Sequence, residues 1–166
     1  MAPNGAIGRS LWDQFPRNRY IQRLLQLCKR MQVCLDRSEV YRQWLYHPTQ
    51  RTIYVWEPDL KSESLSFLVV IIAHELGHAL DFDTHPELID QTRERRWWEM
   101  PLEIEAAAFV NGFRLLKDLH IPFSLDHYIE MIDESIAVTV RDTIEREHLC
   151  CLLSKRRLSD ALTCVS

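Results

Sequence analysis

The sequence predicts one α+β domain in which a small, mostly antiparallel β-sheet packs on a central helix, with two or three further helices around it. Three observations predict this fold. Residues 65–80 are apolar on nearly every face, as a buried helix is. Short runs of β-branched and aromatic residues, which are typical of strands, precede them. Segments with apolar residues at helical spacing lie on both sides of these two features.

The composition is that of a globular protein. The chain has 166 residues, of which 46% are hydrophobic, and a formal net charge of −4. We therefore expect a single domain over residues 1–166, with its core over about residues 17–147. The negative charge gives no general electrostatic reason to bind nucleic acid. No glycine lies between Gly8 and Gly77, which excludes the glycine-rich phosphate loops of kinases and dinucleotide-binding proteins.

The five cysteines favour a reducing compartment. They are odd in number, include no Cys-x-x-Cys pair and follow no secretory signal. The longest apolar stretch, residues 67–73, is far shorter than a membrane span. The expectation from these features is a cytoplasmic protein with no membrane partner.

The first half of the chain is expected to hold one helix and the sheet. A helix is predicted to open at Pro16, because apolar residues then recur at helical spacing: Ile21, Leu24, Leu25 and Cys28. Residues 32–35, 40–46 and 52–56 are predicted strands. Residues 47–51 have the length and composition of a hairpin loop, so the last two strands are expected to pair antiparallel.

The second half is expected to be helical. Ser62 or Ser64 is predicted to cap the central helix over residues 65–80. Residues 81–98 are rich in charge and are predicted to form a loop. Pro101 suits the first turn of another helix, which ends near residue 119.

One more long helix is predicted after that. Ser124 is expected to cap it, and its apolar residues share one face: Leu125, Ile129, Ile132, Ile136, Val140 and Ile144. The sequence pattern does not place residues 150–166 in any element.

The pentad His74-Glu75-Leu76-Gly77-His78 carries the chemistry of this chain. Residues four apart lie on one face of a helix, so the imidazoles of His74 and His78 can converge on one metal ion. Glu75 lies one step round the helix, where it can act as general base on a metal-bound water. Gly77 lowers helix stability by roughly 1 kcal/mol relative to Ala. We therefore expect a neighbouring strand or helix to pack closely against it.

A catalytic zinc site needs a third protein ligand, and Glu105 is the first candidate. It lies in the first turn of the next predicted helix, and small residues follow it on its own face. Glu103 points to nearly the opposite side, so only one of the two can face the metal. Asp81 and Asp83 are second choices, because loop carboxylates are ordinarily solvent-exposed. His85 comes one residue too late for the metzincin motif, which also needs a preceding glycine.

These motifs resemble the small zinc peptidases of the ImmA/IrrE type, within the wider gluzincin pattern of a His-Glu-x-x-His helix and a glutamate on a later helix. In that family the second helix opens with Glu-Ala-Asn-x-Phe-Ala. Residues 105–110 keep the Glu, the first Ala and the Phe, with Ala107 at the Asn position and Val110 at the last Ala. The resemblance covers about residues 20–119. It implies a zincin-like fold, a substrate strand laid along an edge strand at residues 52–56, and a protein substrate such as a transcriptional repressor.

Together these residues predict a zinc-dependent metallopeptidase acting on a protein or peptide. Zn²⁺ would be held by His74, His78 and Glu105, and Glu75 would activate water for attack on a peptide carbonyl. The sequence does not single out a residue that stabilises the oxyanion. The chemically suitable side chains are Tyr54, His85, His120, His127 and Tyr128.

Three alternative functions fit the sequence less well. A non-catalytic interaction or regulatory module with a zinc staple has no use for Glu75. Binding of single-stranded nucleic acid is suggested by a basic and aromatic cluster, but interleaved glutamates favour packing at a cleft wall. Peptide deformylase has an upstream cysteine ligand, but its glycine-rich motifs are absent, so Cys34 is expected to be a core residue. The basic and aromatic cluster consists of Arg93, Arg95, Arg96, Trp97 and Trp98.

Overall fold

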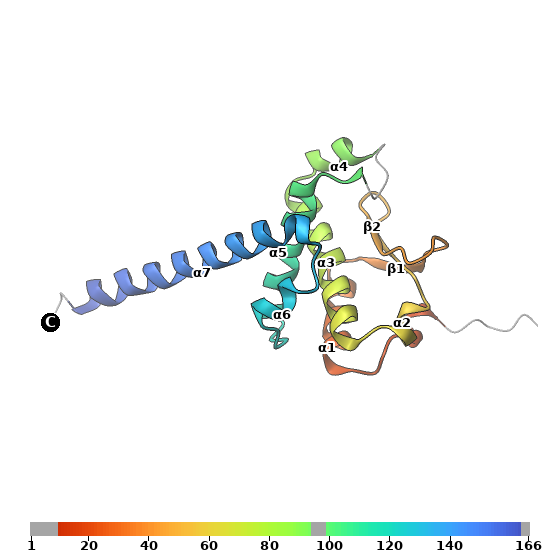
Figure 1. Ribbon diagram of the computed structural model, residues 1–166, viewed down its shortest axis with the longest axis horizontal. Coiled ribbons are helices and arrows are strands. Elements are labelled where there is room, and N and C mark those ends of the chain that lie inside the picture. Colours follow the sequence, from red (N-terminus) through yellow and green to blue (C-terminus); the bar gives the residue numbers. More distant parts are fainter. Residues whose placement is uncertain (1–9, 94–98, 164–166) are drawn as a thin grey trace, which may run out of the picture.

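The computed structural model describes residues 10–93 and 99–163, with side chains as far as His148. The elements in chain order are η1 (Leu11–Gln14), α1 (Arg19–Arg30), β1 (Cys34–Arg37), β2 (Leu45–His47), β3 (Thr52–Val55), α2 (Asp59–Ser62), α3 (Leu65–Thr84), α4 (Glu87–Thr92), α5 (Leu102–Asp118), α6 (Leu125–Ile129) and α7 (Glu134–Thr163). The described chain is α+β, as predicted, and its small three-stranded sheet lies on one side of the central helix α3, with α5, α6 and α7 on the other (Figure 1).

Helix α1 confirms the predicted first helix. It begins at Arg19 rather than at Pro16, because the side chain of Asn18 caps it by accepting a hydrogen bond of 2.8 Å from the Tyr20 N–H. Its apolar stripe is buried as predicted, and these side chains are Ile21, Leu24, Leu25 and Cys28. Burial of this stripe against α3 holds α1 on the core.

The sheet is mixed, so the prediction of a mostly antiparallel sheet is wrong. Strand β3 lies at the centre, where it pairs antiparallel with β2, as predicted, and parallel with β1. The chain passes from β1 at one edge of the sheet to β2 at the other edge, and the hairpin then places β3 between them. Only Leu45–His47 of the predicted strand 40–46 is a strand. Arg42 has a left-handed φ of 54°, which interrupts an extended run.

Because of this strand order, the edge strand near the site is not the one that the sequence predicts. Residues 52–56 are not an edge strand, because β3 is hydrogen-bonded on both sides. The edge that lies beside the central helix is β2, whose Tyr46 backbone N–H donates to the Glu75 carboxylate. A substrate strand that pairs with this sheet near α3 would therefore meet β2.

Helix α3 forms the centre of the molecule. Ser64 caps it by accepting a hydrogen bond of 3.1 Å from the Phe67 N–H, and the helix runs to Thr84, beyond the predicted end near residue 80. It is long and apolar enough to cross a membrane, but 72% of its most apolar window is buried within the protein. Helix α1, the sheet and α5 lie around it (Figure 1), so α3 is a core helix.

Helices α3 and α5 cross with their backbones in contact, as the glycine in the motif predicts. A Cβ on Gly77 would lie less than 3.0 Å from the backbone of Ala108 in α5. A Cβ on Gly112 of α5 would lie 2.9 Å from the carbonyl oxygen of Ala73 in α3. The two glycines thus allow the close approach that brings the first turn of α5 to the motif on α3.

The segment after α3 is more helical than predicted. Residues 81–98 were expected to form a loop, but α3 continues to Thr84 and α4 follows it. Residues 94–98 lie outside the described part of the chain. The helix predicted from Pro101 is confirmed as α5, with Pro101 as its N-cap.

The long helix predicted from Ser124 is two helices. Ser124 caps α6, which ends at Ile129, and the Asp133 side chain accepts a hydrogen bond of 2.9 Å from the Ser135 N–H at the start of α7. This local cap starts a new helix inside a continuous apolar period, which is why periodicity alone did not reveal the break. The first turns of α7 bury Ile136, Val140 and Ile144. The helix then projects away from the body of the molecule (Figure 1).

Candidate metal centre

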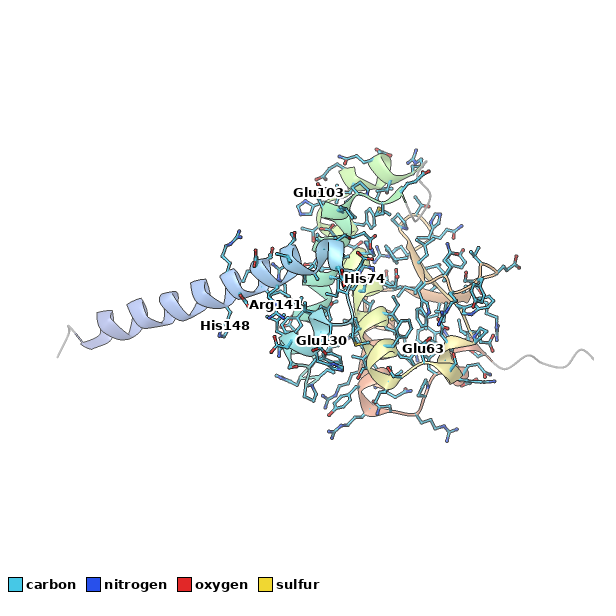
Figure 2. All side chains as sticks on the ribbon, in the orientation of Figure 1. Glu63, His74, Glu103, Glu130, Arg141 and His148 are labelled. Carbon is cyan, nitrogen blue, oxygen red and sulfur yellow. The ribbon has the colours of Figure 1, made fainter. Side chains whose placement is uncertain are left out.

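Three predicted metal ligands converge between α3 and α5. His74 and His78 lie one turn apart on α3 and are buried, and Glu105 enters from the first turn of α5. The Nε2 atom of His74 is 3.4 Å from one Glu105 carboxylate oxygen, and that of His78 is 3.3 Å from the other. One donor atom from each residue lies within 4.8 Å of the others. In Figure 2 His74 lies in the interior of the molecule, whereas Glu103 lies at its surface.

The spacing of these donor atoms fits a small tetrahedral cation. Ligands that bind such an ion at about 2.0–2.1 Å lie roughly 3.3 Å from one another. Each histidine nitrogen lies at about this distance from a different Glu105 oxygen, and one donor from each residue lies within 4.8 Å of the others. Both nitrogen-to-oxygen distances exceed the roughly 2.7–2.9 Å of a direct charge-assisted hydrogen bond. Among the described residues this group has three members, so it leaves a coordination position for a non-protein ligand.

The electrostatics of the group favour an anionic Glu105 between two imidazoles. Burial alone would raise the pKa of Glu105, but the imidazoles of His74 and His78 hold it well below the usual range of a carboxyl. Burial opposes a charge on His78, yet the Glu105 carboxylate outweighs burial and raises the pKa of that imidazole. The Glu105 carboxyl therefore favours its charged form, which is the form that binds a cation.

Packing holds the two imidazole rings in place. Phe109 stacks on His74 with ring centroids 3.8 Å apart, and Phe82 stacks on His78 at 6.2 Å. The Nδ1 atoms of both histidines are buried and have no hydrogen-bond partner among the described residues. In many metal sites the second ring nitrogen of each histidine is hydrogen-bonded to a polar group, which fixes the ring. Here the aromatic contacts fix the rings instead.

Glu75 lies beside this group and is held by the sheet. Its side chain is buried, and one carboxylate oxygen accepts a hydrogen bond of 2.6 Å from the Tyr46 N–H of β2. Burial raises the pKa of Glu75, while the two neighbouring imidazoles lower it by less. The net rise makes this carboxylate a better proton acceptor than an exposed one.

The four residues open into a cleft of about 510 Å³. One face of α3 forms its floor, β2 forms one wall, and the starts of α5 and α7 form the opposite wall. The lining residues on α3 are Phe67, Ile71, His74, Glu75, His78 and Phe82; those around β2 are Arg42, Trp44, Leu45 and Tyr46; those opposite are Met100, Leu102, Glu105, Phe109, Asp133, Ser135 and Ile136.

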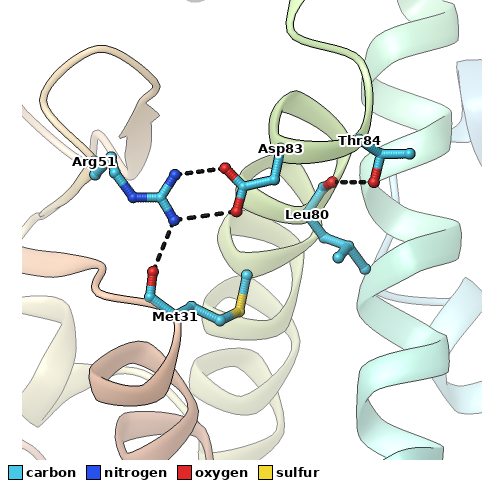
Figure 3. Close-up of polar contacts among 5 residues, drawn as sticks. All are labelled: Met31, Arg51, Leu80, Asp83 and Thr84. Carbon is cyan, nitrogen blue, oxygen red and sulfur yellow. Dashed lines mark hydrogen bonds and ion pairs between the residues drawn. The ribbon is translucent and has the colours of Figure 1, made fainter.

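Arg51 fixes the β2–β3 hairpin to the end of α3 (Figure 3). Its guanidinium donates to the two carboxylate oxygens of Asp83 at 2.5 and 3.1 Å, and to the Met31 carbonyl at 2.7 Å. This fork connects the hairpin with α3 and with the end of α1. It keeps β2 against α3, where Tyr46 meets Glu75, and it shows that Asp83 serves this contact rather than the metal group.

The other candidate ligands stay outside the metal group. Asp81 is buried, and it lines a second pocket together with His85 and Glu103. Cys34 is exposed on β1, so its expected place in the core is wrong, and it does not join the metal group either. Arg93 pairs with Asp90, and the rest of the basic and aromatic cluster falls in residues 94–98, outside the described part of the chain.

None of the five side chains that are chemically suited to stabilise an oxyanion lines the cleft. The Tyr128 hydroxyl is buried and donates to the Phe109 carbonyl at 2.7 Å, and the Tyr54 hydroxyl donates to Gln50. His85 and His127 lie beside glutamates at the surface, and His120 is exposed.

Sequence reasoning missed several cleft residues. Arg42, Asp133 and Ser135 come from loops and a helix start, where no periodic pattern marks a common site. Trp44 carried a weak signal, because it is a large aromatic residue in the predicted strand 40–46. Its indole N–H donates to the buried Asp59 carboxylate at 3.0 Å, which fixes the ring in the cleft wall.

Comparison of the chain with protein-family models, curated proteins and solved structures gives no match.

Proposed function

We propose that this protein is a zinc-dependent peptidase. The observation that carries the proposal is the Glu75 carboxylate, which is buried in an open cleft beside three converging metal ligands. Two histidines and one carboxylate, with a position left for a non-protein ligand, are the donor set of catalytic zinc sites. A structural site, by contrast, has four protein ligands and needs no base.

His74, His78 and Glu105 would hold the zinc, whose role when bound is to polarise the substrate carbonyl and to acidify water. Glu75 takes a proton from the attacking water as the water oxygen bonds to the peptide carbonyl carbon. Glu75 then gives this proton to the leaving nitrogen as the C–N bond breaks. The Tyr46 N–H holds one oxygen of Glu75, which leaves the other for the proton.

The open cleft supports a protein or peptide as the substrate. The edge strand β2 forms one of its walls, and a short stretch of an extended peptide can lie along such an edge. Likeness of residues 105–110 to the ImmA/IrrE-type peptidases favours a transcriptional regulator as the target, and the cysteine content favours the cytoplasm. Both points are part of the proposal.

The proposal is tested by metal content and turnover in four proteins. These are the wild type and the variants Glu105→Ala, Glu103→Ala and Glu75→Gln. Glu103 is the matched control, because it lies on the same helix turn as Glu105 but is exposed. We expect about one zinc per chain by elemental mass spectrometry in all except Glu105→Ala.

Turnover is measured on a peptide library by mass spectrometry. We expect Glu75→Gln to lose at least about 100-fold in rate while keeping its zinc. A folded wild type that binds no added zinc would overturn the proposal. A wild type that holds zinc but cleaves nothing would point instead to a zinc-stabilised interaction module.

A further inference from the structure

The floor of the cleft includes an apolar side chain, Ile71, that the core does not fully bury. From Leu68 to Ala79 every residue of α3 is buried except Ile71, which is partly exposed and lines the cleft. Phe67, one turn earlier on the same face, is also partly exposed there. The face continues directly to His74 and His78, because the four positions follow helical spacing. An apolar strip therefore leads to the metal ligands.

The opposite wall completes an apolar pocket with this strip. Phe109 is partly exposed in the cleft and stacks on the His74 ring, so the pocket begins at a metal ligand. Leu102 of α5 is 56% exposed and lines the same cleft. We call these residues the apolar pocket: Phe67, Ile71, Leu102, Phe109 and Ile136. None of the five side chains carries a charge or a hydrogen-bonding group.

The sheet edge offers little main-chain pairing to a substrate. Strand β2 has only three residues, and the Tyr46 N–H in its middle already donates to Glu75. An extended peptide would therefore gain few backbone hydrogen bonds along this wall. Selectivity must then come mainly from burial of a substrate side chain.

We propose that the apolar pocket binds a bulky aliphatic or aromatic side chain of the substrate, at a residue next to the cleaved bond. This inference rests on the proposed peptidase function and names its substrate class. A charged side chain at that position would lose its hydration and find no partner among the five pocket residues. Arg42, the cation that lines the same cleft, already pairs with Glu63 at 2.9 Å.

The test measures binding of two dipeptide hydroxamates to the zinc-loaded protein by calorimetry. The compounds differ only in the side chain next to the zinc-binding group, which is leucine in one and aspartate in the other. We expect the wild type to bind the leucine compound at least about tenfold more tightly. Equal binding of the two compounds, or binding of neither, would overturn the inference.

Variants at Ile71 locate the preference in the pocket. Ile71→Ala removes pocket surface and Ile71→Trp fills the pocket, and we expect each to weaken the leucine compound by about tenfold with zinc content unchanged. Val138→Ala is the matched control, since Val138 is 68% exposed and does not line the cleft. Unchanged binding in both Ile71 variants would contradict the inference.

Mapping of cleavage sites separates this inference from the proposed function. A wild type that cleaves peptides with no apolar preference at either side of the bond overturns the pocket assignment alone. A wild type that holds no zinc or cleaves nothing overturns the peptidase itself.

Discussion

At Gly77, which lies between the predicted metal ligands His74 and His78 in the sequence, the backbones of α3 and α5 meet. A side chain at this position would run into the carbonyl group of Ala108. The glycine is therefore needed for packing, although it lowers the intrinsic stability of the helix. Because α5 carries Glu105 and α3 carries the two histidines, the close crossing at Gly77 also sets the distance between the ligands.

Gly77→Ala is expected to destabilise the protein despite the better helix propensity of alanine. Propensity alone would add roughly 1 kcal/mol, but the helices must separate to admit the Cβ, which costs about 1–3 kcal/mol or more. We expect a net loss in the free energy of unfolding, measured by urea denaturation, together with weaker zinc binding. Gly112→Ala is the comparison, because its Cβ would meet Ala73 backbone and the Tyr128 hydroxyl at about 2.9 Å, a milder clash. A more stable Gly77→Ala protein would contradict this account.

The site residues that the sequence could predict are those fixed by local geometry. His74 and His78 share a face because helical spacing places them there, and the burial of α3 follows from its apolar run. Glu105 was predictable because a helix start followed by small residues favours close packing. The sequence could not single out an oxyanion residue, since the place of each suitable side chain depends on how distant elements pack. Tyr128 turned inward to Phe109, and no pattern in the sequence encodes that contact.

At the scale of elements, errors arose where local caps and strand order decide the structure. The break between α6 and α7 depends on the Asp133 cap inside a continuous apolar period. The parallel pairing of β1 with β3 depends on where the chain crosses the sheet, which short strand patterns do not specify. The hairpin was predictable, because a short loop between two strands permits only antiparallel pairing.

The fork between Arg51 and Asp83 is expected to hold the hairpin more than it stabilises the whole fold. Both side chains are more than a third exposed, so the ion pair contributes at most about 1 kcal/mol to unfolding. Arg51 has a left-handed φ of 48°, and Arg51→Lys keeps both the charge and a non-glycine residue at this position. A lysine ammonium cannot bond both Asp83 oxygens and the Met31 carbonyl in the way the guanidinium does. We expect faster amide hydrogen exchange in residues 45–52 with a small change in Tm.

Arg141→Lys serves as the control for that variant. Arg141 also pairs with an aspartate, Asp126, but on the helices α6 and α7 rather than on the hairpin. Hairpin exchange should match the wild type in this control. Equal exchange in Arg51→Lys and the wild type would show that the hairpin is held by its apolar contacts alone.

At the scale of the whole molecule, the body is built around α3, and α7 is only partly attached to it. The first turns of α7 contribute Ile136, Val140 and Ile144 to the core, and Ile136 also lines the cleft. Beyond them the helix leaves the body (Figure 1). The core on α3 includes α1, the sheet and α5, and its burial does not depend on an ion. The apo chain is therefore expected to stay folded, unlike a zinc finger.

Removal of metal is expected to lower the stability of this folded chain without unfolding it at room temperature. A ligand at about 100 times its Kd adds about 2.7 kcal/mol, which corresponds to roughly 5–10 °C in Tm for a chain of this size. Calorimetry with and without EDTA measures this shift in the wild type, and zinc added after EDTA should restore it. Glu105→Gln should give the same Tm in both conditions, because the neutral amide is a poor ligand. An EDTA effect of equal size in this variant would mean that the stabilising ion is bound elsewhere than between α3 and α5.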